Sequence, residues 1–241
     1  MYGFGIGGGH WGGVFCDQVA VPYADAMLTP LPDELDPVAA ASVADNVCDG
    51  YRHIAPYLPE ILHRDPGAEV LIVAGVTRRP LFSPSIPLYA GLVARTLGAR
   101  TIYFIDTRSQ VRSHARRLGL VPLHPTESRS LSPAPLVVDA SAHPRGLRLA
   151  LSATAPDGVC SSAGTLHTRA SLPVGMMYAR NMSLHVARTH ARTLIPLVLE
   201  LMAAGRLHPE SVTTTVAPLD DAPSVLRDHV TGDSTKTILI T

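Results

Sequence analysis

The chain has 241 residues, of which 46% are hydrophobic and 17% are charged, with a formal net charge of zero and a pI near 7.2. This length can bury a sizeable core in one large domain, or in one domain with a partial second one. The balanced charge does not favour a nucleic-acid or acidic-membrane partner, because either surface attracts a basic excess.

The three cysteines, Cys16, Cys48 and Cys160, are odd in number and far apart in the sequence. This spacing fits neither a disulfide framework nor a paired-cysteine metal site, and it is typical of proteins in a reducing compartment. No apolar run reaches the roughly 18 residues that span a bilayer, and no basic segment followed by an apolar one opens the chain. We therefore expect a soluble protein of the cytoplasm.

The N-terminal part of the chain predicts a loop, a strand and a helix. Residues 1–13 contain seven glycines, which disfavour a regular element. Residues 14–21 alternate between apolar and polar side chains, as a half-buried strand does. Pro37 suits the first turn of a helix, which small and apolar residues continue to Tyr51.

The stretch over 69–107 predicts a strand, a crossover helix and a second strand. Residues 70–74 form an apolar run that is too short for a lone helix and suits a strand buried on both faces. Apolar residues at helical spacing follow over 86–97, and 101–105 is a second run rich in β-branched and aromatic residues. This order is that of a right-handed parallel βαβ unit.

The rest of the chain continues to alternate between strands and helices. The expected helices are 109–118, 144–153, 189–204 and 220–230, and the expected strands are 136–139, 158–163, 172–177, 182–186, 212–216 and 237–240. The alternation over 69–205 predicts an α/β fold with one doubly wound parallel sheet. The strands at 14–21, 212–216 and 237–240 do not continue this alternation, so we assign them to a smaller β-rich part.

Asp106 directly follows the second strand of the βαβ unit. In dinucleotide-binding proteins an acid at this position accepts hydrogen bonds from the adenosine ribose. The loop after the first strand, however, has one glycine, Gly75, where such proteins have three, and its prolines remove amide donors that a phosphate uses. The alternative is an ordinary parallel sheet in which an acid ends one strand.

Several segments, in order, resemble the medium-chain dehydrogenase/reductase superfamily, and the zinc-type alcohol dehydrogenases in particular. The resemblance runs over essentially the whole chain and rests on residues 12–15, 21–26, 31–33, 45–51, 85–89, 138–141, 156–158, 201–207 and 232–237. It implies an N-terminally truncated member with a Rossmann-like nucleotide-binding domain over 51–205. Residues 1–50 are then a remnant of the GroES-like catalytic domain, and residues 206–241 return to that remnant.

The resemblance implies a nicotinamide cofactor, NAD, which takes up or donates a hydride. The matching cofactor-binding residues are Gly75 and Ser85 in the phosphate loop, Asp106 at the ribose, Lys236 near the pyrophosphate, and Ser141 and Gly164 at strand ends beside the nicotinamide. Asp106 favours NAD over NADP. Pro87 stands where the family has the last glycine of the phosphate loop.

The family's catalytic zinc is not expected in this chain. Asp45 matches the third zinc ligand, but the other two, a cysteine and a histidine, lie in an N-terminal domain that the chain almost entirely lacks. A catalytic zinc needs at least three protein ligands. We therefore expect Asp45 or a histidine such as His53 to move the proton, with Cys48 as a further candidate ligand or nucleophile. The alternatives are a capping or solvated acid for Asp45 and a small buried thiol for Cys48.

The sequence thus predicts an NAD-dependent oxidoreductase that acts on a small organic alcohol or carbonyl compound without zinc. Two alternatives stay open. One is a cofactor-independent lyase, isomerase or cyclase that uses the same cleft, and the other is a catalytically silent subunit that binds a partner. In this family the strands equivalent to residues 171–186 pair across a dimer, so we expect a homodimer.

Overall fold

A computed structural model describes residues 12–16, 18–78, 82–163, 170–232 and 234–241. Its main feature is a six-stranded parallel sheet with the strand order β3-β2-β1-β4-β5-β6. The strands are β1 Val70–Val73, β2 Ile102–Ile105, β3 Val121–Leu123, β4 Ala134–Asp139, β5 Thr154–Ser162 and β6 Ser183–Val186. This order is that of a doubly wound Rossmann-like sheet, so the predicted α/β fold is confirmed.

The central strands are the apolar runs of the sequence. All four residues of β1 are buried, and the strand pairs with β2 on one side and with β4 on the other. In this register Val73 is level with both Ile105 and Asp139. The three strands therefore end at the same edge of the sheet, where the acid Asp106 follows β2.

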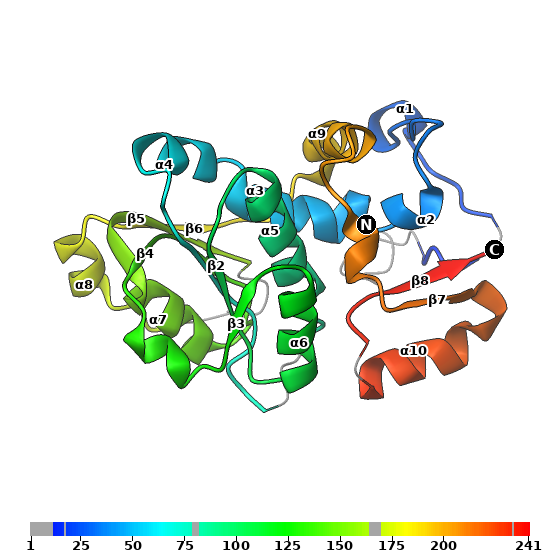
Figure 1. The fold of residues 1–241 in the computed structure, drawn as a ribbon. Coiled ribbons are helices and arrows are strands. Elements are labelled where there is room, and N and C mark those ends of the chain that lie inside the picture. Colours follow the sequence, from blue (N-terminus) through cyan, green and yellow to red (C-terminus); the bar gives the residue numbers. More distant parts are fainter. Residues whose placement is uncertain (1–11, 17, 79–81, 164–169, 233) are drawn as a thin grey trace.

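The helices that cover the sheet are α3 Cys48–Ile54, α4 Leu58–Arg64, α5 Ser85–Thr96, α6 Ser109–Arg117, α7 Pro144–Ser152, α8 Val174–Ala179 and α9 Ala191–Ala203. Alternate residues of β1 face two different cores. Ile72 packs in the core with α3, α5, α6 and α9, whereas Leu71 packs in the core with α7. The sheet thus lies between two layers of helices (Figure 1).

The remaining elements lie beside the large sheet. They are α1 Ala24–Met27, α2 Pro37–Ala40, a π-helical segment Val43–Val47, β7 Thr215–Pro218, α10 Ala222–Thr231, β8 Thr237–Ile240, and three 3-10 turns at Glu127–Ser130, Pro209–Val212 and Leu219–Asp221. The strands β7 and β8 pair in parallel as a separate two-stranded sheet, which Figure 1 shows to the right of the six-stranded one. The division of the chain at residues 50 and 205 stays a prediction.

Three sequence predictions differ from the structure. Residues 14–21 form no strand in their described part, where residues 14–16 and 18–20 are exposed and belong to neither sheet. Residues 172–177, expected as a strand, overlap helix α8, since a short apolar run fits either element by periodicity. The helix expected from Pro37 to Tyr51 is divided into α2, the π-helical segment and the start of α3.

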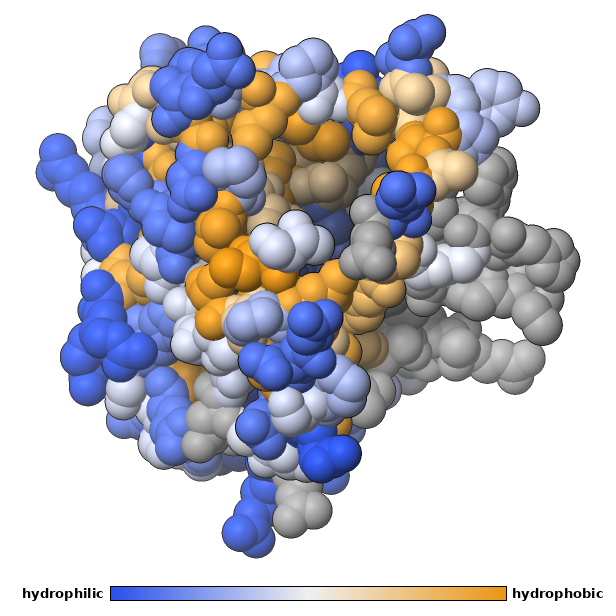
Figure 2. Space-filling view, turned by 90° about the vertical axis from the view of Figure 1, so that its right-hand side faces the viewer, coloured by the Kyte–Doolittle hydropathy of each residue, from blue (hydrophilic) through white to orange (hydrophobic). Residues whose placement is uncertain are grey.

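One face of the molecule is strongly apolar. Figure 2 shows the side that lies on the right in Figure 1, where apolar side chains gather around a hollow. The elements on this side carry exposed large apolar residues, such as Met27 on α1, Val216 on β7 and Ile240 on β8. Over the described ranges, none of the helices is both long enough and apolar enough to cross a lipid bilayer.

Candidate functional site

Two buried acids mark the edge at which the parallel strands end. Asp106 follows β2 with an exposed fraction of 0%, and Asp139 is the last residue of β4 with an exposed fraction of 1%. In open α/β sheets, ligands bind in the crevice outside the carboxyl ends of the strands. Buried carboxylates need partners, so the contacts of these two acids determine what this edge can bind.

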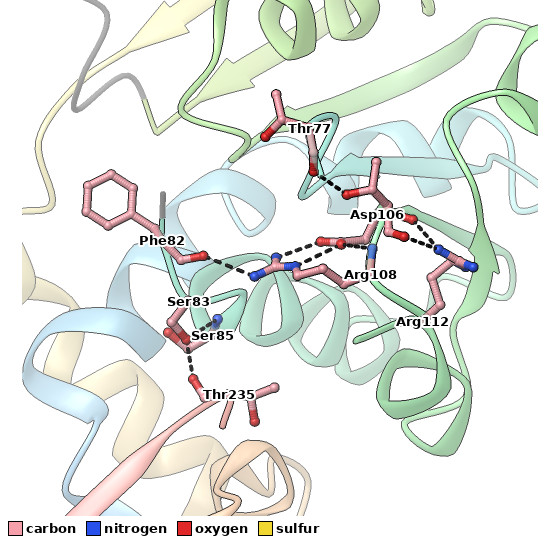
Figure 3. A network of polar contacts seen from close by, with 9 residues as sticks. Thr77, Phe82, Ser83, Ser85, Asp106, Arg108, Arg112 and Thr235 are labelled. Carbon is pink, nitrogen blue, oxygen red and sulfur yellow. Dashed lines mark hydrogen bonds and ion pairs between the residues drawn. The ribbon is translucent and has the colours of Figure 1, made fainter. Parts of the chain in front are cut away.

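The carboxylate of Asp106 is occupied by Arg108 (Figure 3). The Oδ1 atom accepts hydrogen bonds from the Arg108 main-chain nitrogen at 2.8 Å and from its Nε at 3.0 Å, and Oδ2 accepts one from Nη2 at 2.8 Å. The Nη1 atom of Arg108 donates to the carbonyl oxygen of Phe82 at 3.2 Å. A ribose hydroxyl that binds Asp106 therefore has to displace this guanidinium, which is 25% exposed and can turn towards solvent.

The turns after β1 and β2 fit the adenosine end of a dinucleotide. A Cβ atom added at Gly75 would lie 2.7 Å from Oδ2 of Asp106, so only glycine lets the first turn approach the acid this closely. The hydroxyl of Thr107 donates to the carbonyl of Thr77, and Nη1 of Arg112 donates to the carbonyls of Asp106 and Thr107 at 2.8 Å each. These bonds hold the acid in place beside the glycine.

The start of α5 fits a pyrophosphate less well. Its first amide, that of Ser85, donates to the hydroxyl of Ser83 at 3.3 Å, and its third residue, Pro87, has no amide hydrogen. This leaves at most the amide of Ile86 for a phosphate. The hydroxyl of Ser83 donates in turn to the carbonyl of Thr235 (Figure 3), which ties this loop to the C-terminal segment. The residues therefore fit a nucleotide at the ribose rather than at the phosphates.

Asp45 and Lys236, both predicted site residues, lie on either side of Asn46. The amide of Asn46 donates to Oδ2 of Asp45 at 3.2 Å, and Nζ of Lys236 donates to Oδ1 of Asn46 at 2.6 Å. Desolvation raises the pKa of Asp45, Asp49 acts in the same direction, and Lys236 opposes it. Burial lowers the pKa of Lys236. A carboxyl group that reaches solvent with a raised pKa can exchange a proton with a ligand.

Cys48 lies in the core with an exposed fraction of 0%, and its Sγ is 3.9 Å from the carbonyl oxygen of Ala191. Burial raises the pKa of this thiol to about 12, with Asp45 and Asp49 acting in the same direction. The side chain is therefore a neutral thiol at pH 7, and a neutral thiol is a poor nucleophile. This environment favours the interpretation of Cys48 as a packed side chain.

His53 is fully buried between α3 and β5. Its Nδ1 lies 2.8 Å from Oγ of Ser161, and its Nε2 has no hydrogen-bond partner among the described residues. The nearest acid, Asp49, has Oδ1 3.8 Å from Nε2 and accepts hydrogen bonds from Arg52 and Thr189. Burial lowers the pKa of His53 to about 3, and Arg52 adds to this effect. The imidazole is therefore neutral at pH 7 and has no contact with solvent.

The burial of His53 predicts a loss of stability in acid. The unfolded state protonates this residue near pH 6.5 and the folded state only near pH 3, so the unfolded state binds more protons between these values. We expect this residue to cost about 2 kcal/mol of unfolding free energy between pH 7 and pH 5. Urea denaturation measures the unfolding free energy at pH 7 and at pH 5. The loss between these two pH values should be smaller by about 2 kcal/mol in His53→Gln than in the wild type. Equal differences in the two proteins would contradict the prediction.

Asp139 is satisfied by two serines at the ends of neighbouring strands. Its Oδ1 accepts a hydrogen bond from the hydroxyl of Ser141 at 2.6 Å, and its Oδ2 accepts one from the hydroxyl of Ser162 at 2.9 Å. Ser141, which the sequence places beside the nicotinamide, thus holds a buried acid in the structure. Gly164, the other residue predicted there, lies outside the described residues.

Sequence reasoning missed two residues of this edge. Arg108 was not singled out, although it stands two residues after Asp106, a spacing at which a turn can return a side chain to the acid. Asp49 was not singled out either, and no local pattern distinguishes it from a solvated acid. Within the described part of the chain, no three histidine, cysteine or acidic side chains gather closely enough to hold a metal ion.

No family model matches the chain. A probable zinc-binding alcohol dehydrogenase of Mycobacterium tuberculosis is 25% identical to it over 225 residues, which are 90% of this chain and 55% of the relative. The chain therefore spans about half the length of this curated relative.

Solved structures share the fold. An alcohol dehydrogenase from Thermus sp. ATN1 matches with a TM-score of 0.80 and 24% identity over 95% of this chain and 66% of that one. A putative zinc-binding dehydrogenase from Sinorhizobium meliloti, solved with bound NADP, matches with a TM-score of 0.71 and 15% identity over 88% of this chain and 61% of that one. Together with the zinc-binding alcohol dehydrogenase relative, these matches confirm the resemblance to the zinc-type alcohol dehydrogenases.

Proposed function

We propose that this chain is an oxidoreductase of the alcohol dehydrogenase type, which binds a nicotinamide nucleotide at the carboxyl edge of its sheet and acts on a small organic alcohol or carbonyl compound. The observation that carries this proposal is the buried acid Asp106 at the end of β2, packed against Gly75. This is the arrangement that receives the adenosine ribose in dinucleotide-binding folds. The dehydrogenase names of the relatives support the same reaction class.

The chain's own residues would bind and orient the reactants. Asp106 would accept the ribose hydroxyls in place of Arg108, and Lys236 would supply positive charge near the phosphates. The bound nucleotide would supply the hydride chemistry. Asp45 is the better candidate for moving the proton, because it reaches solvent and has a raised pKa, whereas His53 is sealed in the core. We propose a mechanism without zinc, since Asp45 has no neighbouring ligand set among the described residues.

We also propose a homodimer in the cytoplasm. Among the described residues, strand β6 pairs with β5 alone, so its other side can extend the sheet into a second copy of the chain. The three cysteines are free thiols, as is usual in a reducing compartment. Light scattering coupled to gel filtration tests the dimer, and a monomer at micromolar concentration would contradict it.

Calorimetric titration of the whole chain with NADH tests the proposed function. We expect micromolar binding that weakens at least tenfold in Asp106→Asn, because the amide loses the charge that the ribose hydroxyls favour. Glu60→Gln is the matched control, since Glu60 pairs with Arg64 on the exposed face of α4. Oxidation of short primary and secondary alcohols, followed by NADH absorbance, tests the reaction. Absence of NADH and NADPH binding would exclude hydride transfer and favour cofactor-free chemistry.

A further inference from the structure

A groove of about 280 Å³ lies between α3, the end of β6 and the start of α9. Its chemically distinctive lining residues are Arg52, Tyr57, His185, Arg188, His190 and Leu194. Ligand pockets for drug-sized molecules measure roughly 300–1,000 Å³. At about 280 Å³ the groove lies just below this range, so it suits a molecule smaller than a typical drug.

The lining of the groove is rich in basic side chains. Two arginines and two histidines face it, and none of the described residues that line it is acidic. Asp49 lies behind Arg52 and already accepts hydrogen bonds from Arg52 and from Thr189. Arg188 is exposed and pairs with no acid in the described part of the chain. The positive charge of Arg188 is therefore free to bind an anion.

The other wall of the groove is apolar and held in place. The ring of Tyr57 stacks at a tilt of 43° on His185, with 5.2 Å between the ring centroids. Leu194, from α9, adds an aliphatic surface. An aromatic or aliphatic body can pack against this wall while its charged end reaches the arginines.

The groove also has a location that suits a substrate. Val186 ends β6, which runs parallel to β5, so the groove opens at the same edge of the sheet that carries Asp106 and Asp139. Ligands of open α/β sheets bind at this edge. Charge, apolar wall and location therefore point to one class of ligand.

We propose that this groove binds a small organic carboxylate, with the carboxylate group on Arg188 and Arg52 and the apolar body against Tyr57 and Leu194. Combined with the proposed function, on which this second step rests, the inference makes the substrate an alcohol or carbonyl compound that carries a carboxylate. A guanidinium binds a carboxylate through paired hydrogen bonds, so a neutral analogue of the same shape loses that interaction.

Titration of the whole chain with benzoate and with benzamide, followed by NMR, tests the groove without any nucleotide. The two probes have the same shape and differ in charge. We expect benzoate to bind at least tenfold more tightly than benzamide, and Arg188→Gln to remove that preference while leaving benzamide binding unchanged. Arg148→Gln, on the exposed side of α7, is the matched control and should keep the preference. Equal binding of the probes, or a preference unaffected by Arg188→Gln, would overturn the proposal.

Enzyme kinetics test whether the groove binds the carboxylate of the substrate. We expect a higher kcat/KM for 4-(hydroxymethyl)benzoate than for 4-(hydroxymethyl)benzamide, and a loss of that difference in Arg188→Gln. NADH binding without a benzoate preference would refute the groove and leave the proposed function intact. A benzoate preference that depends on Arg188, in a chain that binds neither nucleotide, would refute the oxidoreductase and leave the groove intact.

Discussion

Replacement of Arg108 by glutamine is expected to tighten NADH binding at least tenfold and to make the nucleotide-free protein less stable. The guanidinium donates to both oxygens of the buried Asp106 carboxylate, which are the atoms that the ribose hydroxyls need. In the wild type, binding has to break this ion pair before the hydroxyls gain their hydrogen bonds. Arg108→Gln removes this cost, so a larger part of the free energy of the ribose hydrogen bonds contributes to the affinity for NADH.

The loss of stability has the same origin. Asp106 is 0% exposed, and a buried carboxylate deprived of its cation is strongly destabilising. Arg108 is itself 25% exposed and is partly screened by solvent. We therefore expect Arg108→Gln to lower the unfolding free energy by about 1–3 kcal/mol, which is less than the cost of breaking a fully buried ion pair. Calorimetry measures the affinity, and urea denaturation with and without NADH measures the stability. The stabilisation by NADH should be larger in the variant than in the wild type.

Arg112→Gln is the control for this prediction. The Nη1 atom of Arg112 donates to the main-chain carbonyls of Asp106 and Thr107. Its replacement should loosen the same turn without releasing the carboxylate, so NADH affinity should not rise. Weaker NADH binding in Arg108→Gln would contradict our interpretation, because it would mean that Arg108 contacts the nucleotide instead of competing with it.

The parallel sheet was predictable because its central strands have a local signal. The apolar side chains of β1 are removed from water only if both faces of the strand are buried. This requirement by itself implies helices above and below the strand. Residues 14–21 have the alternation of a strand, but a strand also needs a neighbour to complete its hydrogen bonds. The described residues of this segment pair in neither of the two sheets. Edge and isolated strands therefore depend on partners that a local pattern does not specify.

The placement of Asp106 in the fold was predictable, whereas its contacts were not. Asp106 is at the end of β2 as its place in the sequence indicates, but its pairing with Arg108 depends on how one turn directs a long side chain. The sequence also presents His53 as a candidate for proton transfer. Its partner Ser161 is 108 residues away, and the packing of α3 on β5 gives the imidazole a pKa of about 3. Long-range packing, which leaves no local pattern, thus decides which candidate side chains can react.

Gly50→Ala is expected to destabilise the fold by about 3 kcal/mol, because helix α3 has no room for a side chain at this position. A Cβ atom there would lie 2.7 Å from the main-chain nitrogen of Ala90 and 2.8 Å from Cβ of Tyr89, both on α5. A main-chain atom within a helix cannot turn aside as the end of a side chain can, so the two helices have to separate. The higher helix propensity of alanine, about 1 kcal/mol, offsets only part of this cost.

Gly175→Ala provides the matched control, since Gly175 also lies in a helix, α8, and a Cβ atom there would meet nothing within 4 Å. It should leave the unfolding free energy unchanged or raise it by up to about 1 kcal/mol. Because α3 carries Arg52, the displacement caused by Gly50→Ala should also weaken benzoate binding in the groove. Urea denaturation and the benzoate titration measure the two effects. Wild-type stability in Gly50→Ala would show that α3 and α5 are not packed as closely as this structure places them.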